Sequence, residues 1–245
     1  TMSAMMTGVK TEEGVISVDQ NVRLSDHRSV KGNEAKTLVE YAEEAGLATG
    51  IVSTARLTHA TPAACYSHSP SRDWESDLEI FNRRKEAWDA KFPDIASQLL
   101  DFKFGDGLEV AMGGGRTNFI PKELTDPEYE AERGNRLDGR DLPKEWTSKY
   151  KDSAFVWNKA QFDAIDAKKT KHLFGLFEPS HMKYEYDRAK DPAGEPSLSD
   201  MTAKAIDVLA GNKKGYFLMV EGGRIDHAHH DGNAFRALTE TISLS

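Results

Sequence analysis

The chain has 245 residues, of which 38% are hydrophobic and 29% charged, and its formal net charge is −8. This length allows one large domain or two small ones with a sizeable core, and the composition is that of a soluble globular protein. The negative charge argues against a nucleic-acid surface, for which a basic patch is expected. No apolar run approaches the ~20 residues of a membrane helix, and no signal peptide opens the chain.

Helix and strand signals alternate along the first half of the chain. In order, the expected elements are a helix over 32–47, a strand over 48–55, a helix over 94–102 and a strand over 107–116 that runs into a glycine turn. Gly46 is a plausible C-cap of the first helix. The segment 120–158 then breaks the rhythm with prolines, glycines and charges, and we interpret it as an irregular surface insertion with apolar anchors such as Trp146.

The second half returns to the alternation. The expected elements are a strand over 171–178, a helix over 198–212, a strand over 214–221 and a helix over 228–244. Ser199 or Asp200 is a possible N-cap of the helix over 198–212, and Gly232 weakens the prediction for the last helix. The strands are continuous apolar runs, which is typical of strands buried on both faces. We therefore expect one α/β domain over 1–245, with a largely parallel central sheet flanked by helices.

A polar group follows the last strand in the stretch "FLMVEGGRIDHAHHDG" (217–232). Ligands gather outside the carboxyl ends of strands in open α/β sheets, and Glu221 stands at such an end. If the next segment is helical, Asp226 and His230 share one face. A carboxylate with an imidazole suits zinc, and a carboxylate with hydroxyls suits magnesium. Acidic residues also favour a solvated first helical turn, so a metal site and a plain helix start remain about equally supported by the residues alone.

A second polar group follows the strand over 48–55 and holds His59, Thr61, His68 and Arg72. A threonine hydroxyl is a hard oxygen ligand compatible with magnesium. The planar fork of Arg72 can grip a phosphate through two hydrogen bonds. Taken singly, each of these residues also fits an ordinary turn or surface role. The lone Cys65 cannot form an intrachain disulfide and is best explained as a small packing residue.

Together these stretches resemble the alkaline phosphatase family. The matching strings are "TGVKT" (7–11), "GLATGIVSTARLTHATPAA" (46–64), "MGGGR" (112–116), "GLFEPSHMKYE" (175–185) and "VEGGRIDHAHHDG" (220–232). The strings "GLFEP" and "RLDGRDL" are similar to the animal-type branch. The resemblance implies a parallel-sheet α/β sandwich that hydrolyses phosphate monoesters with two zinc ions and one magnesium ion.

The resemblance also implies roles for single residues. Asp226 and His230 match ligands of one zinc ion, Thr61 and Glu221 match magnesium ligands, and Arg72 matches the arginine that binds the substrate phosphate. His59 and His227 match positions that surround the metals and the phosphate. The calcium site of the animal-type branch falls on Glu128, the carbonyl of Phe177, Glu178 and Glu195, with Asp191 as a rival for the last place. His68 and His229 are left as structural or surface residues.

Other parts of the family pattern have no counterpart in residues 1–245. The nucleophilic serine would lie three residues before Thr1, and Ser3 is on the wrong side of that register. The remaining zinc ligands are also missing, so the second zinc site is absent and the first is partial. We therefore expect the middle part of an alkaline phosphatase, which resembles homodimeric periplasmic or extracellular enzymes. A sulfatase-like or phosphodiesterase hydrolase and an inactive metal-binding fragment remain alternatives.

Overall fold

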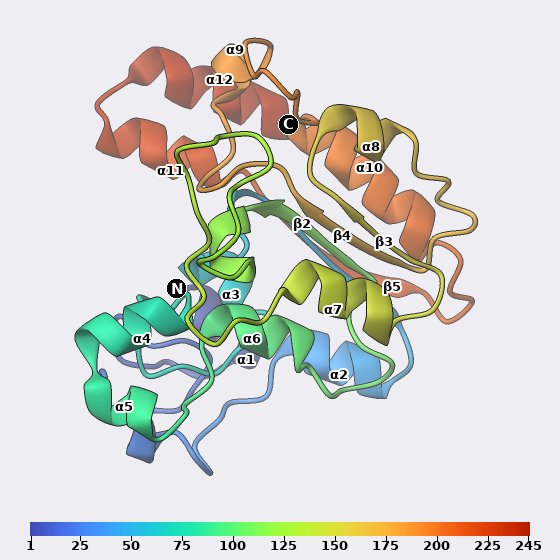
Figure 1. Ribbon diagram of the computed structural model, residues 1–245. Coiled ribbons are helices and arrows are strands. Elements are labelled where there is room, and N and C mark those ends of the chain that lie inside the picture. Colours follow the sequence, from blue (N-terminus) through green and yellow to red (C-terminus); the bar gives the residue numbers. More distant parts are fainter.

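A five-stranded parallel sheet forms the centre of the computed structural model, which describes residues 1–245 (Figure 1). The strands are β1 (Ala48–Arg56), β2 (Val110–Gly114), β3 (Ser153–Val156), β4 (His172–Leu176) and β5 (Tyr216–Glu221). Their order in the sheet is β3-β4-β2-β1-β5, and every neighbouring pair is parallel. The expected α/β fold with a parallel sheet is therefore confirmed.

Helices cover both faces of this sheet. They are α1 (Met2–Thr7), α2 (Leu38–Glu44), α3 (Ala60–Ala63), α4 (Asp77–Arg83), α5 (Lys85–Asp89), α6 (Ile95–Leu100), α7 (Leu142–Lys149), α8 (Lys159–Asp163), α9 (Glu185–Arg188), α10 (Leu198–Leu209), α11 (Gly223–His230) and α12 (Ala234–Leu244), with short 3-10 turns at His27–Ser29 and Arg116–Phe119. None of the helices has the length and apolar character that crossing a membrane requires.

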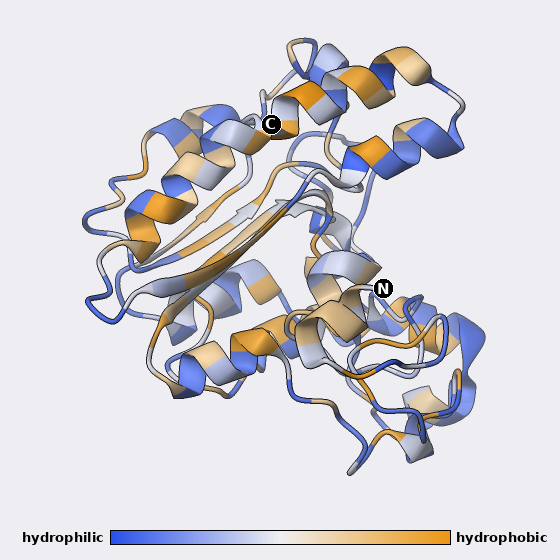
Figure 2. Ribbon diagram, turned by 180° about the vertical axis from the view of Figure 1, so that it is seen from behind, coloured by the Kyte–Doolittle hydropathy of each residue, from blue (hydrophilic) through white to orange (hydrophobic).

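The core consists of two apolar layers, one on each face of the sheet. Ile51 of β1 belongs to the layer formed with α2, α6 and α7, while the next residue, Val52, belongs to the layer formed with α8 and α10. Successive side chains of a strand point to opposite faces, so both faces of β1 are apolar. Figure 2 shows hydrophobic residues along the strands and on the helices that flank them. This explains why the strands are continuous apolar runs in the sequence.

Three boundaries differ from the sequence prediction. The first helix begins only at Leu38, because Thr37 forms a capping box with Glu40 and ends the extended segment before it. Ser197, not Ser199 or Asp200, caps α10, since its side chain accepts from the Asp200 N–H. The helix expected over 228–244 is interrupted at Gly232, whose φ of 64° lies in the left-handed region. It forms the separate helices α11 and α12.

The segment 120–158, expected as an irregular insertion, is irregular only up to residue 141. It then forms α7 and β3, and β3 pairs with β4 to make one edge of the sheet. Trp146 is fully buried and its ring packs against Phe174 of β4. The apolar anchors of this segment therefore belong to the main core, because β3 needs cover on its faces like the other strands.

The opposite edge of the sheet is formed by β5, which pairs only with β1. Its burial is lower than that of the inner strands, and Tyr216 is 40% exposed. Helix α12 also has an exposed apolar face. Its residues Phe235, Leu238 and Ile242 are 55%, 64% and 73% exposed. The molecule therefore presents an unpaired strand edge at β5 and apolar side chains on α12 to solvent.

Two carboxyl groups meet at the amino edge of the sheet. Glu43 on α2 accepts a hydrogen bond from the Thr49 hydroxyl, and Glu109 accepts one from the Thr49 N–H (2.6 Å). Burial is the main cause that raises the pKa of Glu43 to about 7 and that of Glu109 to about 8, and the charges of Glu43 and Asp106 add to the effect on Glu109. Near neutral pH Glu109 is therefore largely protonated in the folded protein, and Glu43 is partly protonated.

We expect these groups to lower stability as the pH rises. In the unfolded chain both ionise near pH 4.5, whereas in the folded protein they ionise near pH 7 and 8. Their contribution is thus complete below pH 4.5 and is lost as the pH rises through about 8, and the part that belongs to Glu43 alone is on the order of 3 kcal/mol. In urea unfolding, Glu43→Gln should flatten this pH dependence. The exposed neighbour Glu44→Gln should leave it unchanged, and an equal slope in both variants would contradict the explanation.

Candidate active site at the carboxyl edge of the sheet

A cavity of about 740 Å³ lies at the carboxyl ends of β1 and β5. Five of the side chains predicted from the sequence line it: His59, Thr61, Arg72, Glu221 and Asp226. They come from the end of β5, the start of α11 and the segment that follows β1. Residues 1–4 and 10–16 close another side of the cavity. The structure therefore brings together side chains that are distant in the sequence: His59 and Asp226 are 167 positions apart.

Glu221 and Thr61 converge in this cavity, although they follow different strands. Ser53 Oγ donates a hydrogen bond to Glu221 Oε2 (2.5 Å). Burial raises the pKa of Glu221, and the hydroxyl groups of Ser53 and Thr61 oppose that rise by hydrogen bonding to the carboxylate. The adjacent Gly223 is needed here, because a Cβ atom would lie 2.8 Å from the Cβ of Ala55. A carboxylate with hydroxyl oxygens beside it is a donor set that fits magnesium.

Asp226 and His230 lie one turn apart on α11, as the sequence spacing indicates. Their Oδ2 and Nε2 atoms are 3.5 Å apart, and their side chains are 72% and 78% exposed. This oxygen and nitrogen pair fits zinc. Two protein ligands do not complete a tetrahedral zinc site, so further groups would have to join them.

Arg72 lies beside the same cavity, with its side chain largely in solvent. Its Nη2 is 3.2 Å from Nε2 of His59. No carboxylate pairs with it by salt bridge, so its guanidinium donors remain available to a ligand. This is the property that a phosphate-binding arginine needs.

His59 belongs to a histidine cluster formed by His59, His181 and His227. One ring nitrogen of each lies within 4.8 Å of one ring nitrogen of the others. Burial is the main cause that lowers the pKa of His59 to about 4 and that of His181 to about 2, and neighbouring arginines lower both further. The pKa of His227 is lowered as well, by burial and by Arg224. The three rings are therefore neutral at pH 7.

The side chains predicted for calcium lie in a separate acidic cluster. Carboxylate oxygens of Glu128, Glu178 and Asp191 lie within 4.8 Å of one another. Burial raises the pKa of Glu178 to about 7, against the attraction of Lys183, whose Nζ lies 3.1 Å from it. Such a set of converging carboxylates suits a hard cation such as calcium.

Glu195 and Phe177 stand at the margin of this acidic cluster. Glu195 Oε2 is buried without a hydrogen-bond partner, and burial together with the charges of Glu178 and Asp191 raises its pKa to about 9. Asp191, which the sequence analysis gave as the alternative to Glu195 for the last calcium ligand, lies within the acidic cluster itself. The ring of Phe177 is buried in the core and its N–H donates to Gly113 O (2.9 Å), so only its carbonyl could serve as a ligand.

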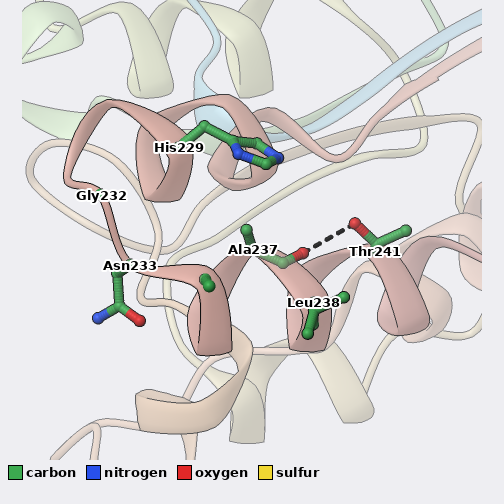
Figure 3. Close-up of a pocket in the computed structure, with 7 residues that line it drawn as sticks. His229, Gly232, Asn233, Ala237, Leu238 and Thr241 are labelled. Atoms are coloured by element: carbon green, nitrogen blue, oxygen red, sulfur yellow. Dashed lines mark hydrogen bonds between the residues drawn. The ribbon is translucent and has the colours of Figure 1, made fainter.

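A smaller hollow between α11 and α12 contains none of the residues predicted as ligands (Figure 3). It is lined in part by His229, Leu238 and Thr241, and the Thr241 hydroxyl donates to Ala237 O (2.8 Å). The exposed His229 makes no contact with the histidine cluster. His68 is structural, because its two ring nitrogens contact Glu40 (2.8 Å) and the carbonyl of Ser17 (2.6 Å).

Comparison with known proteins shows the family to which the chain belongs. The family model described as alkaline phosphatase matches residues 1–245. The chain belongs to the alkaline phosphatase family. It is 44% identical to the tissue-nonspecific alkaline phosphatase of Homo sapiens over 250 residues and 41% identical to the alkaline phosphatase of Gadus morhua over 249 residues. The family match favours this assignment over the sulfatase-like and phosphodiesterase alternatives.

Solved alkaline phosphatases share the fold. The structure from Thermus thermophilus has a TM-score of 0.73 and 31% identity, covering 98% of this chain and 41% of that one. The enzyme from Shewanella sp. has a TM-score of 0.68 and 28% identity. The human and Gadus relatives are covered over 46% and 51% of their length. The chain thus spans about half the length of the alkaline phosphatases it matches.

The sequence prediction did not include His181, Arg56 or Arg224 in the site. His181 is brought in by the glycines at the end of β2. A Cβ atom on Gly114 would lie 2.1 Å from Ser180 O, and the N–H of Gly115 donates to that carbonyl (2.6 Å). One feature of this alkaline phosphatase sequence could have identified His181. It follows the end of β4 by five residues, so it lies at the carboxyl edge of the sheet.

Proposed function

We propose that this chain supplies part of the active site of a metal-dependent alkaline phosphatase that hydrolyses small phosphate monoesters. The observation that carries the proposal is the convergence of Thr61, Arg72, Glu221 and Asp226 on one cavity. Membership of the family supports the reaction class. In this proposal the reaction passes through a phosphoserine intermediate, and the serine and the remaining zinc ligands lie outside residues 1–245.

Arg72 binds the phosphate in this proposal. Its planar fork can donate two hydrogen bonds to two phosphate oxygens, which fixes the phosphorus for in-line attack. His59 keeps Arg72 at the cavity while the site is empty, because its Nε2 lies 3.2 Å from Arg72 Nη2. His59 and His227 are neutral and shape the wall around the phosphate without adding charge of their own.

The donor sets indicate which ion each group of residues would hold. We propose that Thr61 and Glu221 hold magnesium, that Asp226 and His230 hold part of a zinc site, and that Glu128, Glu178 and the Phe177 carbonyl hold calcium with Asp191 or Glu195. When bound, zinc and magnesium supply positive charge that favours an ionised nucleophile and the departing oxygen. Lys183 and Arg116 offset part of the negative charge of the acidic cluster, at 3.1 Å from Glu178 and 3.2 Å from Glu128.

Metal removal tests this proposal on a full-length enzyme that contains residues 1–245. We expect a chelator to abolish hydrolysis of 4-nitrophenyl phosphate and zinc plus magnesium to restore it. Glu221→Ala should not recover with magnesium, because its carboxylate is the only one in that oxygen set. Glu178→Gln is the matched variant: elemental analysis should show less calcium and unchanged zinc. Full activity after complete metal removal would refute the proposal.

We also propose that the full-length protein is a homodimer in the periplasm or outside the cell, as the family resemblance implies. The single buried cysteine is compatible with an oxidising compartment, because it leaves no thiol pair to bridge. Light scattering on the full-length protein measures the oligomeric state, and a mass equal to one chain at micromolar concentration would contradict the dimer.

A further inference from the structure

The ammonium group of Lys183 lies at the acidic cluster. Its Nζ is 3.1 Å from Glu178 Oε1 and donates a hydrogen bond to the Tyr129 hydroxyl (3.1 Å). The same ammonium lies over the Tyr129 ring, 5.2 Å from its centroid. Burial lowers the pKa of Lys183, but the contacts with Tyr129 and Glu178 raise it more, so the side chain is charged. The protein thus supplies a cation of its own to these carboxylates.

This single charge leaves part of the cluster without a partner. Asp191 Oδ2 and Glu195 Oε2 are buried and accept no hydrogen bond, and Glu195 is only 2% exposed. Burial and the nearby charges of Glu178 and Asp191 raise the pKa of Glu195, which places it beside them. Buried carboxylate oxygens without a donor or cation are unfavourable. They point to a ligand that contacts more oxygens than one ammonium can.

Arg116, the other cation at the cluster, is held in place. It is 1% exposed, and its Nε and Nη2 donate to the two oxygens of Asp126 at 2.7 and 2.8 Å. Its contact with Glu128 is longer, at 3.2 Å. Breaking a buried ion pair leaves an uncompensated charge, which is strongly destabilising. Arg116 therefore stays in position whatever else the cluster binds.

Lys183 differs from Arg116 because its charged end can reach water. Its side chain is 36% exposed, and a lysine stem is long enough to carry the ammonium to solvent. The backbone of Lys183 is fixed separately, since its N–H donates to Glu195 Oε1 (2.9 Å). The side chain can therefore leave Glu178 while the chain itself keeps its place at the cluster.

Lys183 and a calcium ion would compete for the same carboxylate. Calcium binds oxygen atoms at about 2.3–2.6 Å, and the ammonium is 3.1 Å from Glu178 Oε1. Two cations on one oxygen repel each other, and burial strengthens that repulsion. Calcium brings two charges and takes about six to eight oxygens, whereas an ammonium has one charge and three donors. Calcium can therefore replace the ammonium, while a monovalent ion would gain little by doing so.

We propose that Lys183 is an internal competitor of calcium at the acidic cluster. Its ammonium holds Glu178 when calcium is scarce and turns to solvent when calcium binds, so the cluster exchanges one cation for the other. This inference rests on the calcium site of the proposed function. Lys183 then lowers the affinity for calcium, stabilises the cluster without calcium, and restricts the site to ions that carry more than one charge.

Calcium affinity tests this inference on a full-length enzyme that contains residues 1–245. The protein is stripped of metal on a chelating resin, reloaded with zinc and magnesium, and titrated with calcium in a calorimeter. Lys183→Met removes the charge and keeps an unbranched stem, and it should lower the Kd for calcium about fivefold. Lys183→Arg keeps the charge and should not lower the Kd.

The matched control is Lys190→Met. Lys190 lies on the same segment, but its side chain is 70% exposed and pairs with Asp187 outside the cluster. The charge removed is the same as in Lys183→Met, and solvent and salt screen it from the calcium site. The Kd for calcium should therefore stay within about twofold of the wild-type value.

Unfolding in urea separates competition from a purely structural role of Lys183. Without calcium, Lys183→Met should unfold at a lower urea concentration than the wild type, because its carboxylates have lost their cation. Saturating calcium should raise the midpoint of Lys183→Met by more than that of the wild type, because stabilisation by a ligand grows as its Kd falls. An equal rise in both proteins would overturn the inference.

The results also separate this inference from the proposed function. If Lys183→Met binds calcium with the wild-type Kd or more weakly, Lys183 does not compete, and the calcium site stands without it. If neither the wild type nor Lys183→Met binds calcium, the calcium site and the competition both fail, and the phosphatase assignment stands. Calcium binding by Lys183→Met but not by the wild type would support the inference.

Discussion

A polypeptide made of residues 1–245 alone is expected to release phosphate from 4-nitrophenyl phosphate at less than about 10⁻⁴ of the rate of the full-length enzyme. The family resemblance implies that neither the nucleophilic serine nor the ligands of the second zinc ion are among these residues. Catalytic groups that act as a unit fail together when one is removed. Arg72 could still bind phosphate, but binding without a nucleophile gives no turnover.

The control for this experiment is the same polypeptide with Arg72→Ala, together with mass spectrometry to exclude full-length enzyme. Turnover that approaches the full-length rate and disappears in the control would mean that the nucleophile lies within residues 1–245. Ser3 would then be the first candidate, because it lines the cavity. Its hydroxyl is only 5% exposed and accepts a hydrogen bond from the Ser17 N–H (3.1 Å). Those contacts argue for a structural role of Ser3.

Replacing Arg72 by alanine in the full-length enzyme should lower kcat/KM by about 10²–10³-fold. The guanidinium is proposed to hold two phosphate oxygens as charge shifts during the reaction, so its loss affects both binding and the transition state. The side chain is exposed and its one side-chain contact is with His59. The variant should therefore unfold at the same urea concentration as the wild type.

Two further variants sharpen this prediction. Arg72→Lys should recover only part of the activity, because an ammonium group cannot bind two oxygens in a planar fork. Arg28→Ala removes an arginine that is 79% exposed and paired with Asp26, and it should leave kcat/KM unchanged. If Arg72→Ala retained wild-type kcat/KM, another cation would have to bind the phosphate, and Arg224 would be the next candidate.

Four of the five strands and the meeting of Glu221 with Thr61 could be predicted from the sequence, whereas β3 lies in the segment expected as an irregular insertion. Each of the four predicted strands is an apolar run, and parallel strands bring their carboxyl ends to one edge, so residues that follow two strands must approach each other. The short helices α3, α4 and α5 were not predicted. They span four to seven residues each, too few for an apolar period to be visible.

The contacts that were not predicted depend on close approach between distant segments. His181 reaches the histidine cluster because Gly114 lets the carbonyl of Ser180 come within hydrogen-bonding distance of Gly115. Glu43 and Glu109 are 66 positions apart and meet through Thr49. No local pattern encodes such a meeting, since each residue alone resembles an ordinary surface carboxylate.

The unpaired edge of β5 has a practical consequence for handling this polypeptide. A strand edge with free N–H and C=O groups is a template for pairing with another chain, and natural proteins usually protect it. The helix α12 adds an apolar face, with Leu238 and Ile242 in solvent. Recombinant production of residues 1–245 should therefore favour inclusion bodies, and refolding yields should fall as the protein concentration rises. Co-expression with the remainder of a full-length alkaline phosphatase should relieve this, because the exposed edge and helix face would then have a cover.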